Sequence, residues 1–175
     1  MLVVILVTGW AVTTLDLFAR AADVQSLYSD LSDKACESVS KSEANYMIVQ
    51  ECPGILGFTL EKNTEDDRDS LTIVRDHQKQ PLDFYGHVTD ALNYLGEKAE
   101  WRVRDGHVYA LIVRMYFTDP ESSKPQQRLI VAKVQTSGSC VTQVINATQS
   151  PHANELARQM ADASQGMKCL WLPKQ

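Results

Sequence analysis

The 175-residue sequence predicts an α+β protein with one antiparallel meander sheet of about six to seven strands and one C-terminal helix packed on it. Short segments rich in β-branched and aromatic residues follow one another through most of the chain. The turns between them are too short for the crossovers that parallel strands require, which predicts antiparallel pairing. A helical repeat of small apolar residues occurs only near the C-terminus. Four cysteines predict two disulfides.

The N-terminal residues predict an export signal. Met1–Val12 (MLVVILVTGWAV) is apolar but too short for a transmembrane helix, which needs about 20 such residues. Ala19-Arg20-Ala21 has the small-x-small form of a cleavage site, so we expect a signal peptide at 1–21 and one α+β domain at 22–175. No Lys or Arg precedes the apolar run, so either the true start lies upstream or this n-region is atypical. The alternative is a buried N-terminal helix.

The cysteines agree with export. Cys36, Cys52, Cys140 and Cys169 are an even set, which favours disulfides in an oxidising compartment. No spacing is CxxC, which argues against zinc binding and thioredoxin-type redox chemistry. Three pairings are open. We expect the nearest neighbours, Cys36–Cys52 and Cys140–Cys169, each worth about 3–4 kcal/mol in the chain-entropy model. The predicted location is the periplasm or the outside of the cell.

The first half of the mature chain predicts strands joined by polar turns. Residues 23–43 are polar and are expected to be irregular or to form one short helical turn. A strand is expected over 45–51, before the breaker Cys52-Pro53-Gly54. Residues 57–62 and 70–75 predict a hairpin. The segment 81–97 is ambiguous and is expected to hold a strand and then a short helix.

The second half has the stronger strand signals. Residues 99–104 alternate in polarity, and Asp105-Gly106 is typical of a type I′ hairpin turn. Residues 108–117 form a long apolar run, which predicts a central strand buried on both faces. Two further strands are expected over 129–135 and 140–147, and they complete the meander.

The last predicted element is an amphipathic helix that ends at Gly166. Ser150 is expected to cap it, and Pro151 suits the first turn because its missing N–H would have no partner there. Its apolar stripe has mostly small side chains, which suits close packing on a sheet. The stripe consists of Ala153, Leu156, Ala157, Met160 and Ala161.

Charge excludes some functions. The formal net charge is −5, the isoelectric point is about 5.3, and no basic block is present. Binding to nucleic acid is therefore not expected, because it depends on neutralising phosphates. A stable membrane anchor is not expected either, since there is no polybasic segment for anionic lipids and no cysteine at the cleavage point.

Residues that suggest catalysis are few. His77 and His87 lie near Asp76, Asp83 and Asp90, a combination that suggests a general base or a metal site. No HExxH or HxH spacing supports a metal, however, and histidines in turns are commonly just solvated. Motifs for a serine nucleophile, a phosphate loop or a dinucleotide are missing from the sequence, so no cofactor is expected.

An acidic cluster precedes the second strand of the predicted hairpin. It consists of Glu61, Glu65, Asp66, Asp67 and Asp69. A calcium loop needs alternating oxygen ligands and a glycine at the bend, and this segment has neither. We therefore expect a solvated hairpin tip.

One strand face offers a candidate binding surface. Glu100, Arg102 and Arg104 share a face, and Arg114 on the next strand extends the basic stripe. Arginines on a rigid sheet bind carboxylates or phosphates through two parallel hydrogen bonds. The alternative is cross-strand pairing with Glu100 on a solvated face. Trp101 has the opposite parity and is expected in the core.

Several short motifs occur in a recognisable order. They are Tyr28-Ser29-Asp30-Leu31, Cys36, Cys52-Pro53-Gly54, Glu100-Trp101-Arg102, Ala110-Leu111-Ile112-Val113-Arg114, Leu129-Ile130-Val131-Ala132-Lys133, Cys140, and Ala153-Asn154-Glu155-Leu156-Ala157-Arg158 with Ala161-Asp162. This order resembles a family of small four-cysteine proteins exported by alphaproteobacteria. The resemblance implies export and the cysteine framework, and it brings no activity with it.

Two functions remain open from the sequence. The first is a non-catalytic exported interaction module, which binds or inhibits a protein of the cell envelope. The alternative is a small hydrolase or small-molecule-binding enzyme that uses His77, His87 and neighbouring carboxylates. The alternative requires at least two of these groups to come within about 3 Å of each other. A purely structural role is a third possibility.

Overall fold

The computed structural model describes residues 23–42, 46–136 and 138–171. The predicted signal peptide and its cleavage point after Ala21 lie outside these residues. None of the helices in the described ranges is long and apolar enough to cross a membrane.

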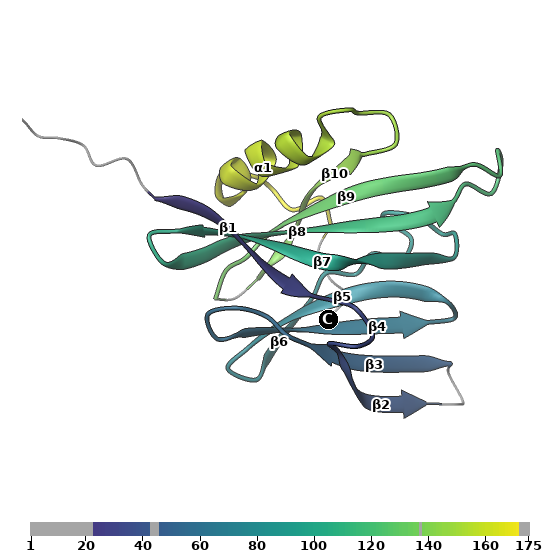
Figure 1. The fold of residues 1–175 in the computed structure, drawn as a ribbon, viewed down its shortest axis with the longest axis horizontal. Helices are drawn as coiled ribbons and strands as arrows, with labels where there is room; N and C mark the ends of the chain where they lie inside the picture. The colour runs from purple at the N-terminus through teal and green to yellow at the C-terminus, as the bar shows by residue number, and fades with distance from the viewer. Residues whose placement is uncertain (1–22, 43–45, 137, 172–175) are drawn as a thin grey trace, which may run out of the picture.

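Strands dominate the described residues, and one α-helix follows them (Figure 1). The strands are β1 Val24–Asp30, β2 Glu37–Ser42, β3 Met47–Cys52, β4 Phe58–Glu65, β5 Arg68–Arg75, β6 Gln78–Pro81, β7 Asn93–Arg104, β8 His107–Thr118, β9 Pro125–Lys133 and β10 Cys140–Asn146. The helix α1 spans Ala153–Ala163, and a 3-10 turn, η1, continues it over Ser164–Gly166. The α+β architecture with a C-terminal helix is therefore confirmed.

The predicted number and direction of the strands were wrong. Ten strands form a mixed sheet in the order β10-β9-β8-β7-β5-β4-β3-β2, with β1 beside β7 and β6 beside β5. Every pairing is antiparallel except that of β5 with β7, which meet in parallel at Arg68 and Asn93. A parallel contact needs a long connection, and the segment between β6 and β7 supplies it.

The sheet separates into two layers at the start of β7. The first residue of this strand, Asn93, lies beside β5, whereas Lys98–Arg104 pair with β1. We call β1 and β7–β10 the upper layer and β2–β6 the lower layer (Figure 1). The buried side chains of both layers meet in one apolar core, in which Trp101 is fully buried, as its parity predicted.

Two segments differ from their sequence predictions. Residues 23–43, expected to be irregular, contain β1 and β2. The strand β1 was not predicted because its buried residue is polar. This residue is Ser29, whose Oγ accepts a hydrogen bond from Trp101 Nε1 at 2.9 Å. Residues 82–92 form turns instead of a short helix, and Leu82 and Phe84 anchor them in the core.

The helix packs on the outer face of the upper layer (Figure 1). Ala153, Ala157 and Ala161 are buried against β8, β9 and β10 and Met160 is partly buried, so these residues of the predicted stripe form the packing face, whereas Leu156 is 37% exposed. The predicted cap was wrong: His152 is the N-cap residue, and it makes no side-chain capping bond. Ser150 contributes only its carbonyl, which accepts the N–H of Ala153 at 3.3 Å.

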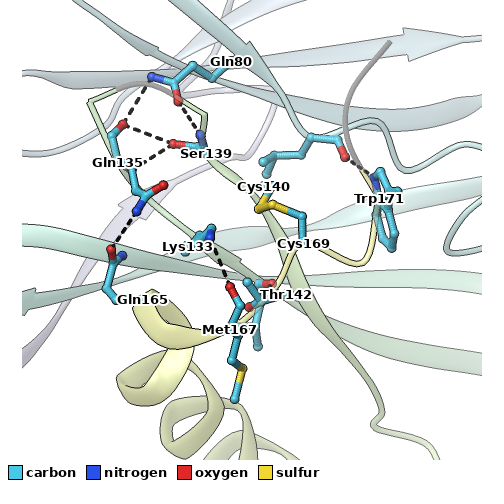
Figure 2. Close-up of a disulfide and its surroundings, with 12 residues drawn as sticks. Gln80, Lys133, Gln135, Ser139, Cys140, Thr142, Gln165, Met167, Cys169 and Trp171 are labelled. Carbon is cyan, nitrogen blue, oxygen red and sulfur yellow. Dashed lines mark hydrogen bonds between the residues drawn. A yellow bond between two sulfur atoms is a disulfide. The ribbon is translucent and has the colours of Figure 1, made fainter.

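Both predicted disulfides are present. Cys36 bonds to Cys52, and Cys140 bonds to Cys169. The first bond ties the segment between β1 and β2 to β3. The second ties the segment after α1 to the start of β10 (Figure 2). Two disulfides fit an oxidising compartment.

Candidate functional site

One end of the two-layer core is closed by hydrogen bonds between the layers. We call it the closed end. Gln80 on β6 is only 8% exposed, and its Nε2 donates to the carbonyls of Gln135 at 3.3 Å and Thr136 at 3.1 Å. Its Oε1 accepts the N–H of Ser139 at 2.7 Å (Figure 2). A single amide therefore joins the lower layer to the turn between β9 and β10.

The C-terminal segment completes the closed end. The N–H of Leu170 donates to the carbonyl of Val141 at 2.9 Å, next to the Cys140–Cys169 disulfide. Trp171 Nε1 then reaches across to the carbonyl of Leu82 at 2.8 Å (Figure 2). The disulfide thus holds a tryptophan over the interface between the layers.

The opposite end of the core is open and forms a cleft of about 1190 Å³. We call it the interlayer cleft. It lies between the ends of β3, β4 and β5 below and of β7, β8 and β9 above, and the segment after β1 forms one side. Its lining includes Leu31, Asp33, Ile48, Gln50, Lys62, Thr64, Asp67, Asp69, Leu92, Leu95, Glu97 and Phe117.

The two walls of the interlayer cleft differ in polarity. The upper wall continues the core with the apolar side chains of Leu95 and Phe117, and Leu92 adds an apolar side chain that is 57% exposed. The inward face of the lower layer changes along its strands. On β4 it runs from Phe58 and Leu60 in the core to Lys62 and Thr64 in the cleft. Polar side chains thus replace apolar ones on this part of the lower wall.

At the back of the interlayer cleft, β7 pairs with β8 on one edge but has little strand pairing on its other edge. Within the described chain, β5 pairs with β7 only at Asn93, and β1 pairs with it only from Lys98 onward. Asp69 replaces the missing strand: its Oδ2 accepts the N–H of Leu95 at 2.9 Å, and its Oδ1 accepts the hydroxyl of Thr64 at 2.6 Å. The carboxylate of Asp69 therefore accepts a backbone N–H of β7 that would otherwise bond to a neighbouring strand.

Lys62 carries the basic charge of the interlayer cleft. The residue is 8% exposed, and its Nζ lies 2.6 Å from Oδ1 of Asp33, whose side chain is largely exposed. The hydrogen bond and the charge of Lys62 lower the pKa of the Asp33 carboxyl. This ion pair links the segment after β1 to the polar wall.

Glu65, Asp66 and Asp67 of the acidic cluster lie at the tip of the β4–β5 hairpin, whereas Glu61 lies within β4 and pairs with Lys79 at 2.7 Å. Asp66 and Asp67 occupy the turn with positive φ values of 49° and 55° and are exposed, as expected for a solvated tip. Asp69 differs, because it is buried and bonded to β4 and β7. Asp67 and Asp69 both line the interlayer cleft, a role that the sequence pattern did not indicate.

The predicted arginine surface faces α1. Glu100, Arg102 and Arg104 do share a strand face, but the helix covers it. Arg102 binds both carboxylate oxygens of Asp162 at 2.9 Å, and Glu100 lies 2.6 Å from Nε of Arg158. The alternative expected from the sequence, cross-strand pairing with Glu100 on a solvated face, was also incomplete, because the partners of Arg102 and Glu100 come from α1.

The other two arginines of this surface have weaker partners. Arg104 Nη2 donates to the carbonyl of Asp162 at 3.3 Å, and its guanidinium lies over the ring of Tyr109. Arg114 lies near the start of α1 and donates to Oδ1 of Asn154 at 2.7 Å and Oε1 of Gln127 at 2.8 Å. Binding of a ligand at these four residues remains a prediction.

The ion pairs beneath α1 shift the pKa values of their carboxyls. Burial opposes ionisation of Glu100, but hydrogen bonds from Arg158 and Ser26 outweigh it and lower the pKa of Glu100. Burial likewise opposes ionisation of Asp162, and hydrogen bonds from Arg102 and Tyr109 lower its pKa. Both carboxylates therefore help to hold the helix on the sheet at neutral pH.

The candidate catalytic histidines are apart from the interlayer cleft. His77 is exposed in the turn between β5 and β6, and His87 is exposed and stacked on Trp171 with ring centres 4.7 Å apart. Over the described ranges, neither imidazole hydrogen-bonds to a carboxylate, and His, Cys, Asp and Glu side chains form no metal-binding group of three or more. The convergence that the enzyme alternative requires is not seen in these residues.

Similarity to known proteins adds nothing to this geometry. No family model, curated protein or solved structure matches the chain.

Proposed function

We propose that the protein is a non-catalytic interaction module of an oxidising compartment, and that the interlayer cleft is where it binds a partner protein. The observation that carries the proposal is the cleft itself, which is open at one end of a core whose other end is closed. Export to the periplasm or the outside of the cell belongs to the same proposal. It is supported by the two disulfides, the apolar N-terminus and the resemblance to an exported alphaproteobacterial family.

The cleft is well suited to binding because its walls are fixed before a partner arrives. Cys36, three residues after Asp33, is bonded to Cys52, which limits movement of the segment that forms one side. Asp69 fixes β7 against β4, and Lys62 fixes Asp33. Groups held in this way lose little conformational entropy on binding, which favours affinity.

The polar groups of the cleft support binding better than catalysis. Asp69 uses both oxygens to accept structural hydrogen bonds, and Lys62 is engaged by Asp33. These two buried charges are therefore committed to holding the walls. The partner that we propose is a protein of the cell envelope, which the module binds or inhibits.

Site-specific photo-crosslinking in the native cells tests this function. A photoreactive phenylalanine analogue replaces Leu92 in the cleft. In a matched control it replaces Val39 on β2, which is 55% exposed and does not line the cleft. We expect one discrete adduct from position 92, identified by mass spectrometry, and none from position 39. The purified partner should then bind the protein in solution. Identical adducts from both positions, or none from position 92, would overturn the proposal.

A further inference from the structure

Two carboxylates of the interlayer cleft form no ion pair with the described residues. Of the five charged residues that line it, Asp33 and Lys62 form an ion pair, and Asp69 is bonded to Leu95 and Thr64. Asp67 on the lower rim and Glu97 on the upper rim are exposed and form no ion pair with any residue in the described ranges. With four carboxylates and one ammonium, the cleft is acidic, as is the whole chain at a net charge of −5.

The walls set a second requirement on the occupant. One wall offers Leu92, Leu95 and Phe117, and the facing wall offers mostly polar and acidic groups, with Ile48 as an apolar exception. In an extended peptide, successive side chains point to opposite sides. A segment lying between the layers therefore presents alternate residues to the apolar wall and to the acidic wall.

The size of the cleft favours a peptide over a small molecule. Its volume of about 1190 Å³ exceeds the roughly 300–1,000 Å³ of small-molecule pockets, and its mouth is open between the layers. Residues 94–97 of β7, which in the described chain have no strand beside their edge away from β8, lie along it in extended conformation. This shape fits an extended chain that enters from the open end.

We infer that the interlayer cleft binds an extended, basic segment of a partner protein in which Lys or Arg alternates with bulky apolar residues. This inference rests on the proposed function and names the chemistry of the partner. The basic side chains face the lower wall at Asp67, one at the mouth reaches Glu97 on the upper rim, and the apolar side chains contact Leu92, Leu95 and Phe117. The negative field of the chain attracts such a segment and repels acidic peptides and nucleic acids.

Three synthetic octapeptides test the inference by fluorescence anisotropy against protein purified after expression of the whole chain. They are an alternating Lys–Val peptide, an alternating Glu–Val peptide, and a peptide with four lysines followed by four valines. We expect the alternating basic peptide to bind at least tenfold more tightly than the acidic peptide, and several-fold more tightly than the block peptide. Its affinity should fall as salt is raised.

Paired variants locate the binding. D67N/E97Q removes the two free carboxylates, and Asn tolerates the positive φ at position 67. The control E51Q/E121Q removes the same charge from two exposed residues that do not line the cleft. We expect at least a tenfold loss of affinity for the basic peptide in D67N/E97Q and less than a twofold change in the control. L92S should weaken binding about fivefold, whereas V39S should leave it unchanged.

The outcomes separate the inference from the proposed function. Equal losses in D67N/E97Q and E51Q/E121Q, or failure of the basic peptide to bind, would overturn the inference. If the acidic peptide binds and L92S abolishes this binding, the inference that the partner segment is basic would be overturned, but the cleft would still be the binding site. The proposed function itself fails only if crosslinking at position 92 also gives no specific adduct.

Discussion

The closed end and the open end lie at opposite ends of one two-layer core, yet they are held by different interactions. At the closed end, a tryptophan and a buried amide connect the two layers, and a disulfide anchors the segment that carries the tryptophan. At the open end, an ion pair holds the segment after β1 to the lower wall, and one carboxylate joins the lower layer to β7 at the back of the cleft. The closed end thus has contacts between the layers across its width, whereas the open end has them only at the back of the cleft.

This difference shows how a small sheet protein can keep a preformed cleft. Stability concentrated at one end allows the other end to expose apolar side chains such as Leu92 without loss of the fold. Binding groups are generally found where a rigid scaffold leaves them accessible. The comparison therefore predicts that substitutions at the closed end cost far more free energy of unfolding than substitutions in the interlayer cleft.

Loss of the closed-end disulfide should have the largest effect. C140A/C169A opens a loop of 29 residues and frees the segment that carries Trp171, so we expect a loss of about 3–4 kcal/mol in the free energy of unfolding. C36A/C52A opens a loop of 16 residues and should cost about 3 kcal/mol or less. Urea unfolding of both variants measures the difference. A larger loss for C36A/C52A would contradict the idea that stability is concentrated at the closed end.

The amide of Gln80 should rank second. Q80A leaves the buried N–H of Ser139 without an acceptor, a loss we expect to cost about 1–3 kcal/mol. Q78A on the same strand removes an exposed amide and should change stability by less than about 0.5 kcal/mol. Thermal unfolding of the two variants and the parent protein compares them. Equal melting temperatures for Q80A and Q78A would show that the amide does not connect the layers.

The closed end was easier to predict from sequence than the open end. Even cysteine number and short separations predicted the Cys140–Cys169 disulfide of the closed end, as they did Cys36–Cys52 beside the cleft, and the helical repeat of alanines predicted the packing face of α1, the helix that leads to Cys169. These signals are local or depend on residue type alone. The Glu100, Arg102 and Arg104 face was also predicted by strand alternation, but its cover was not, because Asp162 and Arg158 lie about 60 residues further along the chain.

The interlayer cleft depends on contacts that leave no periodic pattern. Its back wall exists because Asp69 takes the place of a strand beside Leu95, 26 residues away. The acidic cluster was visible in the sequence, but its position at the mouth follows from the single parallel contact of β5 with β7. The strands β1 and β2 were missed for a related reason, since polar residues such as Ser29 are satisfied by distant partners.

Acid should weaken the attachment of α1 before it affects the core. Because the pKa of Glu100 is lowered in the folded state, its contribution to stability is complete above its unfolded pKa of about 4.5 and is lost as pH falls through the folded value. We expect E100Q to remove roughly 1 kcal/mol at pH 7, and to show less additional loss than the parent protein below pH 4.5. E121Q, at an exposed carboxyl, is the control. Parallel pH profiles for E100Q and the parent protein would contradict this assignment.

The smallest effect is expected in the interlayer cleft. K62M removes the ion pair with Asp33, but solvent already surrounds Asp33, and a methionine retains most of the apolar stem that Lys62 buries. We therefore expect less than about 1 kcal/mol of change in the free energy of unfolding, compared with no change for K124M, which is exposed. Urea unfolding measures both variants. A loss above 2 kcal/mol for K62M would mean that the open end is held as firmly as the closed end. A small loss would mean that the cleft can be altered residue by residue in a folded protein, so that changes in peptide affinity report on contacts in the cleft.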